Sequence, residues 1–254
     1  MKSVSSISNR AVLAGALMLG ALAAPTAAIA QEEEKALTIS GNVAFVSDYR
    51  FRGISYSDLD PALQGGITLE HKSGFFIGAW GSSIADFNGS TVEMDLTAGW
   101  AGTLAGLDIS AGGLLYGYPG GTDTNIVELF GTVGVPLGPV TATFGVNWAP
   151  SQDNLDRSSR YAFGTLSAGI PNTPITLKAT LGNERGGLVA DESGSTTSKW
   201  DWLVGADLTW EMLTFGVAYV GNDLTGRTIT DGDYSFRANR VAKDTVTFSV
   251  TAAF

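Results

Sequence analysis

Few residues in this chain could do chemistry. His71 is the single histidine, and cysteine is absent. A hydrolase built on a Ser–His or Asp–His arrangement needs its histidine beside partner groups at a face that substrate can reach. The sequence instead places His71 beside a tight turn at residues 72–73. A metal site made by clustered histidine or cysteine ligands is excluded as well. We therefore predict that the protein is not an enzyme, with no catalytic residues, no metal site and no cofactor.

Two loops carry carboxylates that could contact Ca²⁺, "SQDNLD" at residues 151–156 and "DGDYSF" at residues 231–236. Neither has the ligand spacing of a Ca²⁺-binding loop, so we interpret both as solvated loops. The many glycines do not form a phosphate-binding loop, because no strand–glycine–helix context surrounds them.

The remaining groups with chemical potential are charges that alternate with aromatic residues. Arg50 and Arg52 follow Tyr49 and Phe51 in strict alternation. In a strand, successive side chains point to opposite faces. This stretch therefore predicts a strand with charge on a wet face and aromatic rings on an apolar one.

The same period of two runs along the whole chain after residue 36, and no helical period competes with it. In the run 91–101, Val92, Met94 and Leu96 alternate with Glu93 and Asp95. The pattern predicts about twelve strands, near 37–52, 63–71, 74–86, 91–101, 107–117, 125–135, 140–149, 159–170, 175–184, 199–211, 213–221 and 244–254. The phase of 75–86 and of 159–170 is ambiguous.

The connections between these runs alternate in length. Tight turns are expected at 72–73, 102–106, 136–139, 171–174 and 211–212, and longer polar loops at 53–62, 119–124, 150–158, 185–198 and 222–243. The short link at 87–90 is the exception. Short turns at one end and long loops at the other are the arrangement of outer-membrane barrels, and an even strand number places both termini at the periplasmic end.

Three further observations favour a membrane barrel over a soluble sheet. The polar faces are mostly Gly, Thr, Ser and Asn, whereas a water-exposed sheet is usually richer in Lys and Glu. From Trp200 to Trp210 one apolar stripe spans roughly 25 Å along a tilted strand, the height of an outer-membrane apolar band. The last run ends within an apolar stripe at Phe254. We therefore predict an all-β fold, a closed antiparallel transmembrane β-barrel of about 12 strands.

The first thirty residues have the features of a secretory signal peptide. Lys2 and Arg10 give a positively charged region before an apolar segment at 11–24, and "AIA" at 28–30 fits a cleavage site. We predict a cleaved signal peptide at 1–30, a periplasmic leader at 31–36 and one outer-membrane barrel domain at 37–254. The formal net charge of −10 argues against nucleic acid as a partner.

Charges on the polar phases should face the barrel interior, because an arginine that faced lipid near the midplane would cost roughly 2–4 kcal/mol. The candidate pore-lining residues are Asp48, Arg50, Arg52, Glu93, Asp95, Glu128, Lys178, Asp201, Asp207 and Glu211. The aromatic residues expected at the lipid interface are Tyr49, Phe51, Trp100, Trp148, Trp200, Trp202, Trp210 and Phe254. These charges either line a water-filled pore or pair across a narrow barrel and plug it.

The stretch "SDYRFRGISYSD", followed by "PALQGG" and "SGFFIGAWGSS", resembles the signature of the TorF family of Gram-negative porins. The resemblance is sharp over residues 45–83 and elsewhere is one of overall layout. It implies an outer-membrane barrel with a transport role. The terminal aromatic, Phe254, also looks like the signal that the outer-membrane barrel assembly machinery recognises.

Several functions remain open from the sequence. The leading hypothesis is an outer-membrane porin or channel in a Gram-negative bacterium, in contact with outer-membrane lipid and passing small hydrophilic solutes. Because carboxylates outnumber cations on the inward phases, it should prefer cations or neutral solutes. The alternatives are a non-conducting structural or adhesion barrel whose loops bind partners, an outer-membrane enzyme, and a soluble periplasmic binding protein.

Overall fold

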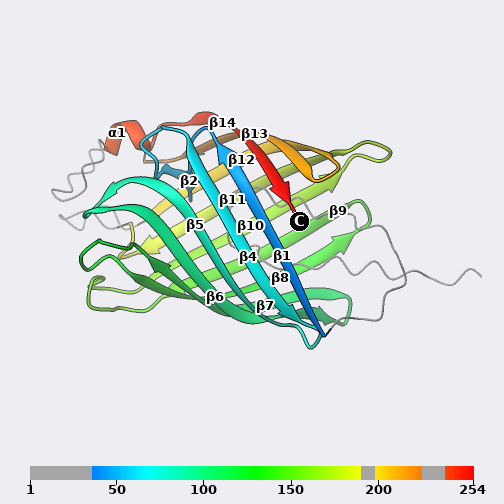
Figure 1. Cartoon of the computed structure of the whole chain (residues 1–254), viewed down its shortest axis with the longest axis horizontal. Helices are drawn as coiled ribbons and strands as arrows, with labels where there is room; N and C mark the ends of the chain where they lie inside the picture. The colour runs from blue at the N-terminus through cyan, green and yellow to red at the C-terminus, as the bar shows by residue number, and fades with distance from the viewer. Residues whose placement is uncertain (1–35, 190–197, 225–237) are drawn as a thin grey trace, which may run out of the picture.

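The computed structural model describes residues 36–189, 198–224 and 238–254. In this part of the chain, twelve antiparallel strands close into one barrel (Figure 1). The barrel strands are β1 (Leu37–Val46), β4 (Ala62–His71), β5 (Phe75–Phe87), β6 (Ser90–Leu104), β7 (Leu107–Gly117), β8 (Ile126–Leu137), β9 (Val140–Ala149), β10 (Ser159–Gly169), β11 (Ile175–Gly186), β12 (Ser198–Trp210), β13 (Leu213–Asn222) and β14 (Thr245–Ala253). The predicted fold class is confirmed. The predicted signal peptide at 1–30 lies outside the described residues, as does the leader apart from Ala36.

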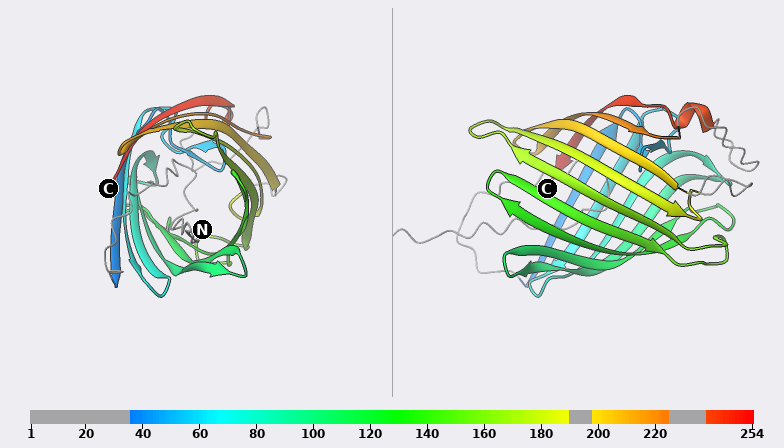
Figure 2. Two further views of the ribbon diagram at one scale, coloured as in Figure 1. Left: turned by 90° about the vertical axis from the view of Figure 1, so that its right-hand side faces the viewer. Right: turned by 180° about the vertical axis from the view of Figure 1, so that it is seen from behind.

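Each barrel strand pairs with the next one along the chain, and β1 closes the ring by pairing with both β4 and β14. At this closing seam the register joins Asn42 to Ala253 and Val46 to Ser249. The backbone groups of Gly41 and Phe254 add two hydrogen bonds of 2.8 and 2.9 Å. The view along the barrel in Figure 2 (left) shows the continuous ring of strands.

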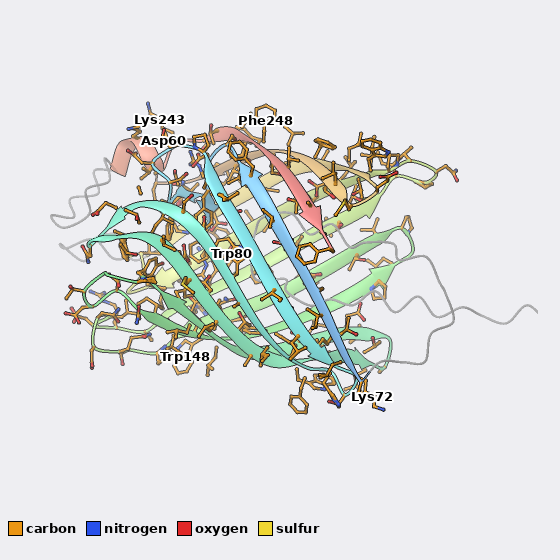
Figure 3. The ribbon with its side chains drawn as sticks, in the orientation of Figure 1. Asp60, Lys72, Trp80, Trp148, Lys243 and Phe248 are labelled. Atoms are coloured by element: carbon orange, nitrogen blue, oxygen red, sulfur yellow. The ribbon has the colours of Figure 1, made fainter. Side chains whose placement is uncertain are left out.

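The outer face of the barrel is apolar, as the period of two predicts. On β14, Val246, Phe248 and Val250 are exposed, whereas Thr251 is buried inside. Trp148 and Phe248 point away from the barrel wall in Figure 3. Trp148, Trp200, Trp210 and Phe254 are between 45 and 73% exposed, and Trp100 and Trp202 occupy the same outward phase of their strands. Their contact with lipid stays a prediction.

The two ends of the barrel differ as expected. One end, the turn end, carries tight connections such as residues 138–139 and 211–212. The other, the loop end, carries residues 47–61, 118–125, 150–158, 187–197 and 223–244, with the short link at 88–89 as the exception. Parts of the fourth and fifth loops, 190–197 and 225–237, lie outside the described residues.

The two strands of ambiguous phase are now placed. On β5, Phe76 and Ser82 are buried inside while Phe75 and Ile77 are exposed. The register with β6 shifts between Ser83 and Phe87, and this irregularity obscures the alternation in the sequence. On β10, Tyr161 is buried inside and Leu166 is exposed.

Some inner-wall glycines make room for aromatic rings. A Cβ added to Gly145 would lie 2.3 Å from the ring of Phe163, and one added to Gly182 would lie 2.1 Å from the Tyr161 hydroxyl. Phe163 and Tyr161 stack with ring centroids 5.5 Å apart. These glycines let two large rings lie against the wall rather than across the interior.

One element differs from expectation. The alternation predicted a first strand from 37 to 52, but β1 ends at Val46 and the chain then turns into the barrel. It forms a small hairpin there from β2 (Arg50–Phe51) and β3 (Ile54–Ser55). The described residues also include a short helix, α1 (Ala238–Val241), and none of their helices is long and apolar enough to cross a membrane.

Candidate functional site

Residues 47–61, called the inward segment below, form the centre of the candidate site. Ser47 leaves the β1–β14 pairing after its backbone amide donates to the carbonyl of Phe248 at 2.8 Å. The segment then folds onto the inner wall, where the amide of Ala85 on β5 donates to the carbonyl of Tyr56 at 2.8 Å. Asp60, from the end of this segment, lies at the loop end (Figure 3). The inward segment therefore occupies the loop end of the interior.

The hairpin turn explains how an arginine reaches the centre of the barrel. Phe51 pairs with Ile54, so Arg52 and Gly53 form a two-residue connection. Both have positive φ, 47° and 84°. This is the conformation of the tight hairpin turns whose twist suits antiparallel strands. Arg52 is thereby carried at the tip of the hairpin.

The aromatic side chains of the inward segment pack on the inner wall formed by β5 and β7. Tyr49 lies 5.5 Å from Trp80, and Phe51 lies 5.6 Å from Tyr116, measured between ring centroids. Tyr56 packs between them, 5.6 Å from Tyr49 and 5.3 Å from Phe51. Tyr49 is only 6% exposed.

The prediction that Tyr49 and Phe51 face lipid is therefore wrong. The alternation continues beyond Val46, but it separates two interior surfaces, an aromatic one and an ionic one. The apolar surface that attracts these rings is the inner wall at the loop end, which the sequence pattern cannot distinguish from lipid.

The opposite face of the inward segment is ionic, and Arg52 is its hub. Its guanidinium donates to Glu128 Oε2 on β8 at 2.6 Å and to Glu184 Oε1 on β11 at 2.5 Å. Tyr116 and Asn147 donate to the same oxygen of Glu128 at 3.0 and 2.9 Å. Burial opposes the charge of Arg52, but Glu184 and Glu128 outweigh it, so its pKa lies well above the usual value. The hairpin tip is thus bound to two separate parts of the wall.

A second cation extends this network to β12. Lys199 Nζ lies 2.9 Å from Glu184 Oε2 and 3.4 Å from Asp201 Oδ2, and it donates to the backbone carbonyl of Arg52 at 2.8 Å. Tyr161 donates to Asp201 at 2.9 Å, and the Arg52 guanidinium stacks over its ring at 4.4 Å from the centroid. Six strands, β7 to β12, and the inward segment therefore share one hydrogen-bonded cluster.

Arg50 fixes the base of the hairpin. Its Nε donates to Asp48 at 2.5 Å, and its Nη1 donates to the carbonyls of Val241 and Lys243 at 2.9 Å each. Asn222 on β13 donates to the carbonyls of Gly53 and Ala242, also at 2.9 Å. The inward segment is thereby joined to residues 241–243, which precede β14. Lys243 marks this part of the chain in Figure 3.

Two more groups of predicted residues lie on the inner wall. Lys178 and Asp207 pair at 2.8 Å, and Lys178 lines the same cavity as Arg50 and Arg52. Glu93 and Asp95 on β6 are 0 and 1% exposed, and none of their carboxylate oxygens has a hydrogen-bond partner among the described residues. The other predicted interior carboxylates, Asp48, Glu128, Asp201 and Asp207, each pair with an arginine or a lysine.

The structure corrects the list of pore-lining candidates at one position. Asp48, Arg50, Arg52, Glu93, Asp95, Glu128, Lys178, Asp201 and Asp207 lie inside the barrel. Glu211 does not, because it forms the exposed turn between β12 and β13 with a φ of 52°. A two-residue turn leaves the strand pattern, so the phase of β12 does not extend to it.

His71 ends β4 beside the turn at residues 72–74, as expected. Its Nδ1 lies 2.7 Å from the hydroxyl of Ser73, and both side chains are exposed. Lys72 marks this turn in Figure 3, at the opposite end from the inward segment. In the part of the chain that is described, no three histidine, aspartate or glutamate side chains gather as a metal site.

The family profile described as "Bacterial protein of unknown function (Gcw_chp)" matches residues 30–254. The chain belongs to the Gcw_chp family. The match does not carry the TorF name. No curated protein matches the sequence.

Solved structures resemble this Gcw_chp chain in fold. The NanC porin, in a rhombohedral crystal form, has a TM-score of 0.56 at 7% identity, covering 85% of this chain and 99% of its own. A structure from work on in-meso crystallization of membrane proteins has a TM-score of 0.51 at 13% identity, covering 85 and 83%. An outer-membrane channel from Pseudomonas putida F1 has a TM-score of 0.48 at 13% identity, covering 85 and 94%. The likeness to the NanC porin supports a porin-like fold.

Sequence reasoning missed several residues of the ionic cluster around Arg52. Glu184 and Lys199 lie on the inward phases of β11 and β12, the phases of the predicted Lys178 and Asp201, so the alternation could have found them. Tyr116, Asn147 and Tyr161 carry no charge, and their role depends on neighbours from distant parts of the chain. Only the closed barrel brings them to Arg52.

Proposed function

We propose that this protein is an outer-membrane channel for passive diffusion of small hydrophilic solutes through a narrow, charged lumen. The observation that carries the proposal is the contrast between the two faces of the barrel. The outer face is apolar, whereas the inner face carries polar side chains outside the ionic cluster as well, with Thr132, Thr143, Thr180 and Thr251 among its buried residues. A water-filled interior accounts for polar side chains that a packed apolar core would not need.

The inward segment sets the selectivity of the proposed channel. It narrows the loop end and brings Arg50 and Arg52 to the passage, but both arginines are neutralised by carboxylates. Interior carboxylates outnumber interior cations, because Glu93 and Asp95 have no cationic partner among the described residues. The passage should therefore favour cations and neutral solutes over anions of the same size.

A second candidate function is a non-conducting structural or adhesion barrel. The density of the ionic cluster favours it, because the side chains of Arg52, Glu184 and Lys199 are only 3 or 4% exposed. A cluster so well satisfied could hold the loop end closed permanently.

Planar-bilayer recording of the purified barrel tests these two functions. The channel proposal expects small resolvable steps and, in a KCl gradient, a reversal potential on the cation-selective side. Liposome swelling with neutral sugars of increasing size gives the upper size limit. Absence of current and of swelling, in preparations that migrate as folded barrels, would favour the non-conducting barrel.

Three finer assignments belong to the same proposal. We place the chain in the outer membrane of a Gram-negative bacterium, which the continuous apolar outer face supports. The signature at residues 45–83 supports kinship with the TorF porins. The closing strand β14 and Phe254, whose ring is 73% exposed, fit recognition by the barrel assembly machinery.

A further inference from the structure

In the described part of the chain, two of the carboxylates on the inner wall lack the cationic partner that the others have. Asp48, Glu128, Glu184, Asp201 and Asp207 each pair with an arginine or lysine at 3.4 Å or less. Glu93 and Asp95 do not: within the described residues they form no ion pair, and none of their carboxylate oxygens has a hydrogen-bond partner within 3.5 Å. An isolated buried carboxylate is costly unless something compensates its charge. Two of them two residues apart on one strand face, about 7 Å from each other, also repel.

The cross-strand neighbours of the two carboxylates, all among the described residues, carry no positive charge. Directly opposite Asp95 lie Trp80 on β5 and Tyr116 on β7, and directly opposite Glu93 lies Ser82. The hydroxyl of Ser82 already donates to the carbonyl of Ser83 at 2.9 Å. The carboxylates therefore stand on a wall of aromatic and neutral side chains.

A third oxygen, from the inward segment, faces the same place. The Tyr49 hydroxyl is buried and has no hydrogen-bond partner, and the Tyr49 side chain is 6% exposed. The Tyr49 ring packs on Trp80 with centroids 5.5 Å apart, and Trp80 lies directly opposite Asp95 on the neighbouring strand. A phenol oxygen from one element and two carboxylates from another are thus buried against the same part of the inner wall, around Trp80.

We propose that Glu93, Asp95 and Tyr49 bind one hard divalent cation, Ca²⁺ or Mg²⁺, and that this ion ties the inward segment to β6. Two carboxylates balance a double positive charge. The donors are all oxygen atoms, which hard cations prefer, and Mg²⁺ in particular is often held by one or two carboxylates with water completing its shell. Soft metals are disfavoured because no thiolate or imidazole is present at the site.

Calorimetric titration of the detergent-solubilised barrel tests the proposal. Protein stripped with EDTA and dialysed is titrated with CaCl₂ and, separately, with MgCl₂ at constant ionic strength. We expect saturable binding of one ion per chain. Combining Glu93→Gln with Asp95→Asn should abolish it, and Tyr49→Phe should weaken it several-fold. Asp207→Asn removes an interior carboxylate that has its own lysine, so it should leave the affinity within about twofold of the wild type.

Two outcomes would overturn the proposal. One is the absence of saturable binding, or equal binding by the double variant and the wild type, provided that both migrate as folded barrels. The other is a thermal stability that rises on acidification in EDTA but does not respond to either cation, which would show that protons neutralise the pair. The titration does not depend on conductance, so a barrel that binds the ion but passes no current would end only the channel proposal.

Discussion

At the scale of single residues, Arg52 connects the most structure. Its guanidinium pairs with Glu128 on β8 and with Glu184 on β11, and its backbone carbonyl accepts a hydrogen bond from Lys199. Arginine suits this position better than lysine, because a planar guanidinium can serve two carboxylates at once in fixed directions. Arg52 is thus the main attachment of the inward segment to the barrel wall.

We expect Arg52→Ala to destabilise the barrel by about 3–5 kcal/mol, the usual cost of removing one partner from a buried ion pair. It should also raise the single-channel conductance, since the hairpin tip loses its hold on β8 and β11. Arg52→Lys should give intermediate values. Urea unfolding in lipid vesicles and bilayer recording measure the two effects.

Arg240→Ala is the matched control for Arg52. Arg240 pairs with Asp58 at 3.1 Å, and both side chains are more than a third exposed. An exposed pair contributes about 0–1 kcal/mol, so this variant should stay near the wild type in stability. Similar losses of stability in the two variants would show that the interior ionic cluster stabilises the barrel no more than the exposed pair does.

At the scale of elements, the strands were predictable and the inward segment was not. The period of two located all twelve barrel strands, because one face of each strand meets an apolar surface and the other a polar one. The same rule failed over residues 47–52, where aromatic rings meet the inner wall instead of lipid. Pairings such as Arg52 with Glu184 join residues far apart in sequence, and no local pattern encodes them. The local clue was the Arg52–Gly53 pair, whose glycine suits a tight hairpin turn.

We expect Gly53→Ala to displace the inward segment while leaving the barrel closed. A Cβ at Gly53 would lie 2.7 Å from the carbonyl oxygen of Gly221 and 3.0 Å from the Cβ atoms of Asn222 and Asp201. Both the positive φ and this contact with the wall oppose alanine. Higher conductance and faster protease cleavage within residues 47–61 are the expected results.

Gly138→Ala separates backbone strain from contact with the wall. Gly138 also has a positive φ, 69°, but an added Cβ would meet nothing within 4 Å, and the residue lies in a turn at the turn end. Its replacement should cost about 1–2 kcal/mol of stability, the usual cost of a left-handed conformation for a residue with a Cβ, and leave conductance unchanged. If both glycine variants conducted alike, displacement of the inward segment would not be the cause.

At the scale of the whole molecule, closure depends on a seam between the two ends of the barrel domain. Five residue pairs join β1 to β14, and the backbone of Phe254 adds two hydrogen bonds to Gly41. The Phe254 ring lies over Gly41, where an added Cβ would come within 2.8 Å of it. Because backbone groups make these bonds, they survive the loss of the ring. The seam and any recognition of the ring by assembly machinery can therefore be tested separately.

We expect Phe254→Ala to lower the amount of folded barrel in outer-membrane fractions of expressing cells several-fold, while the purified variant refolds in detergent nearly as well as the wild type. Heat-modifiable gel migration measures both quantities. Phe248→Ala is the matched control, since Phe248 is a 60% exposed aromatic on the same face of β14. This variant should leave both quantities near the wild-type level, because substitutions at exposed positions usually change stability by no more than about 0.5 kcal/mol. Equal losses in cells for both variants would show that the ring acts only as general apolar surface. Recovery of the wild-type chain with soluble periplasmic proteins would end the outer-membrane assignment itself.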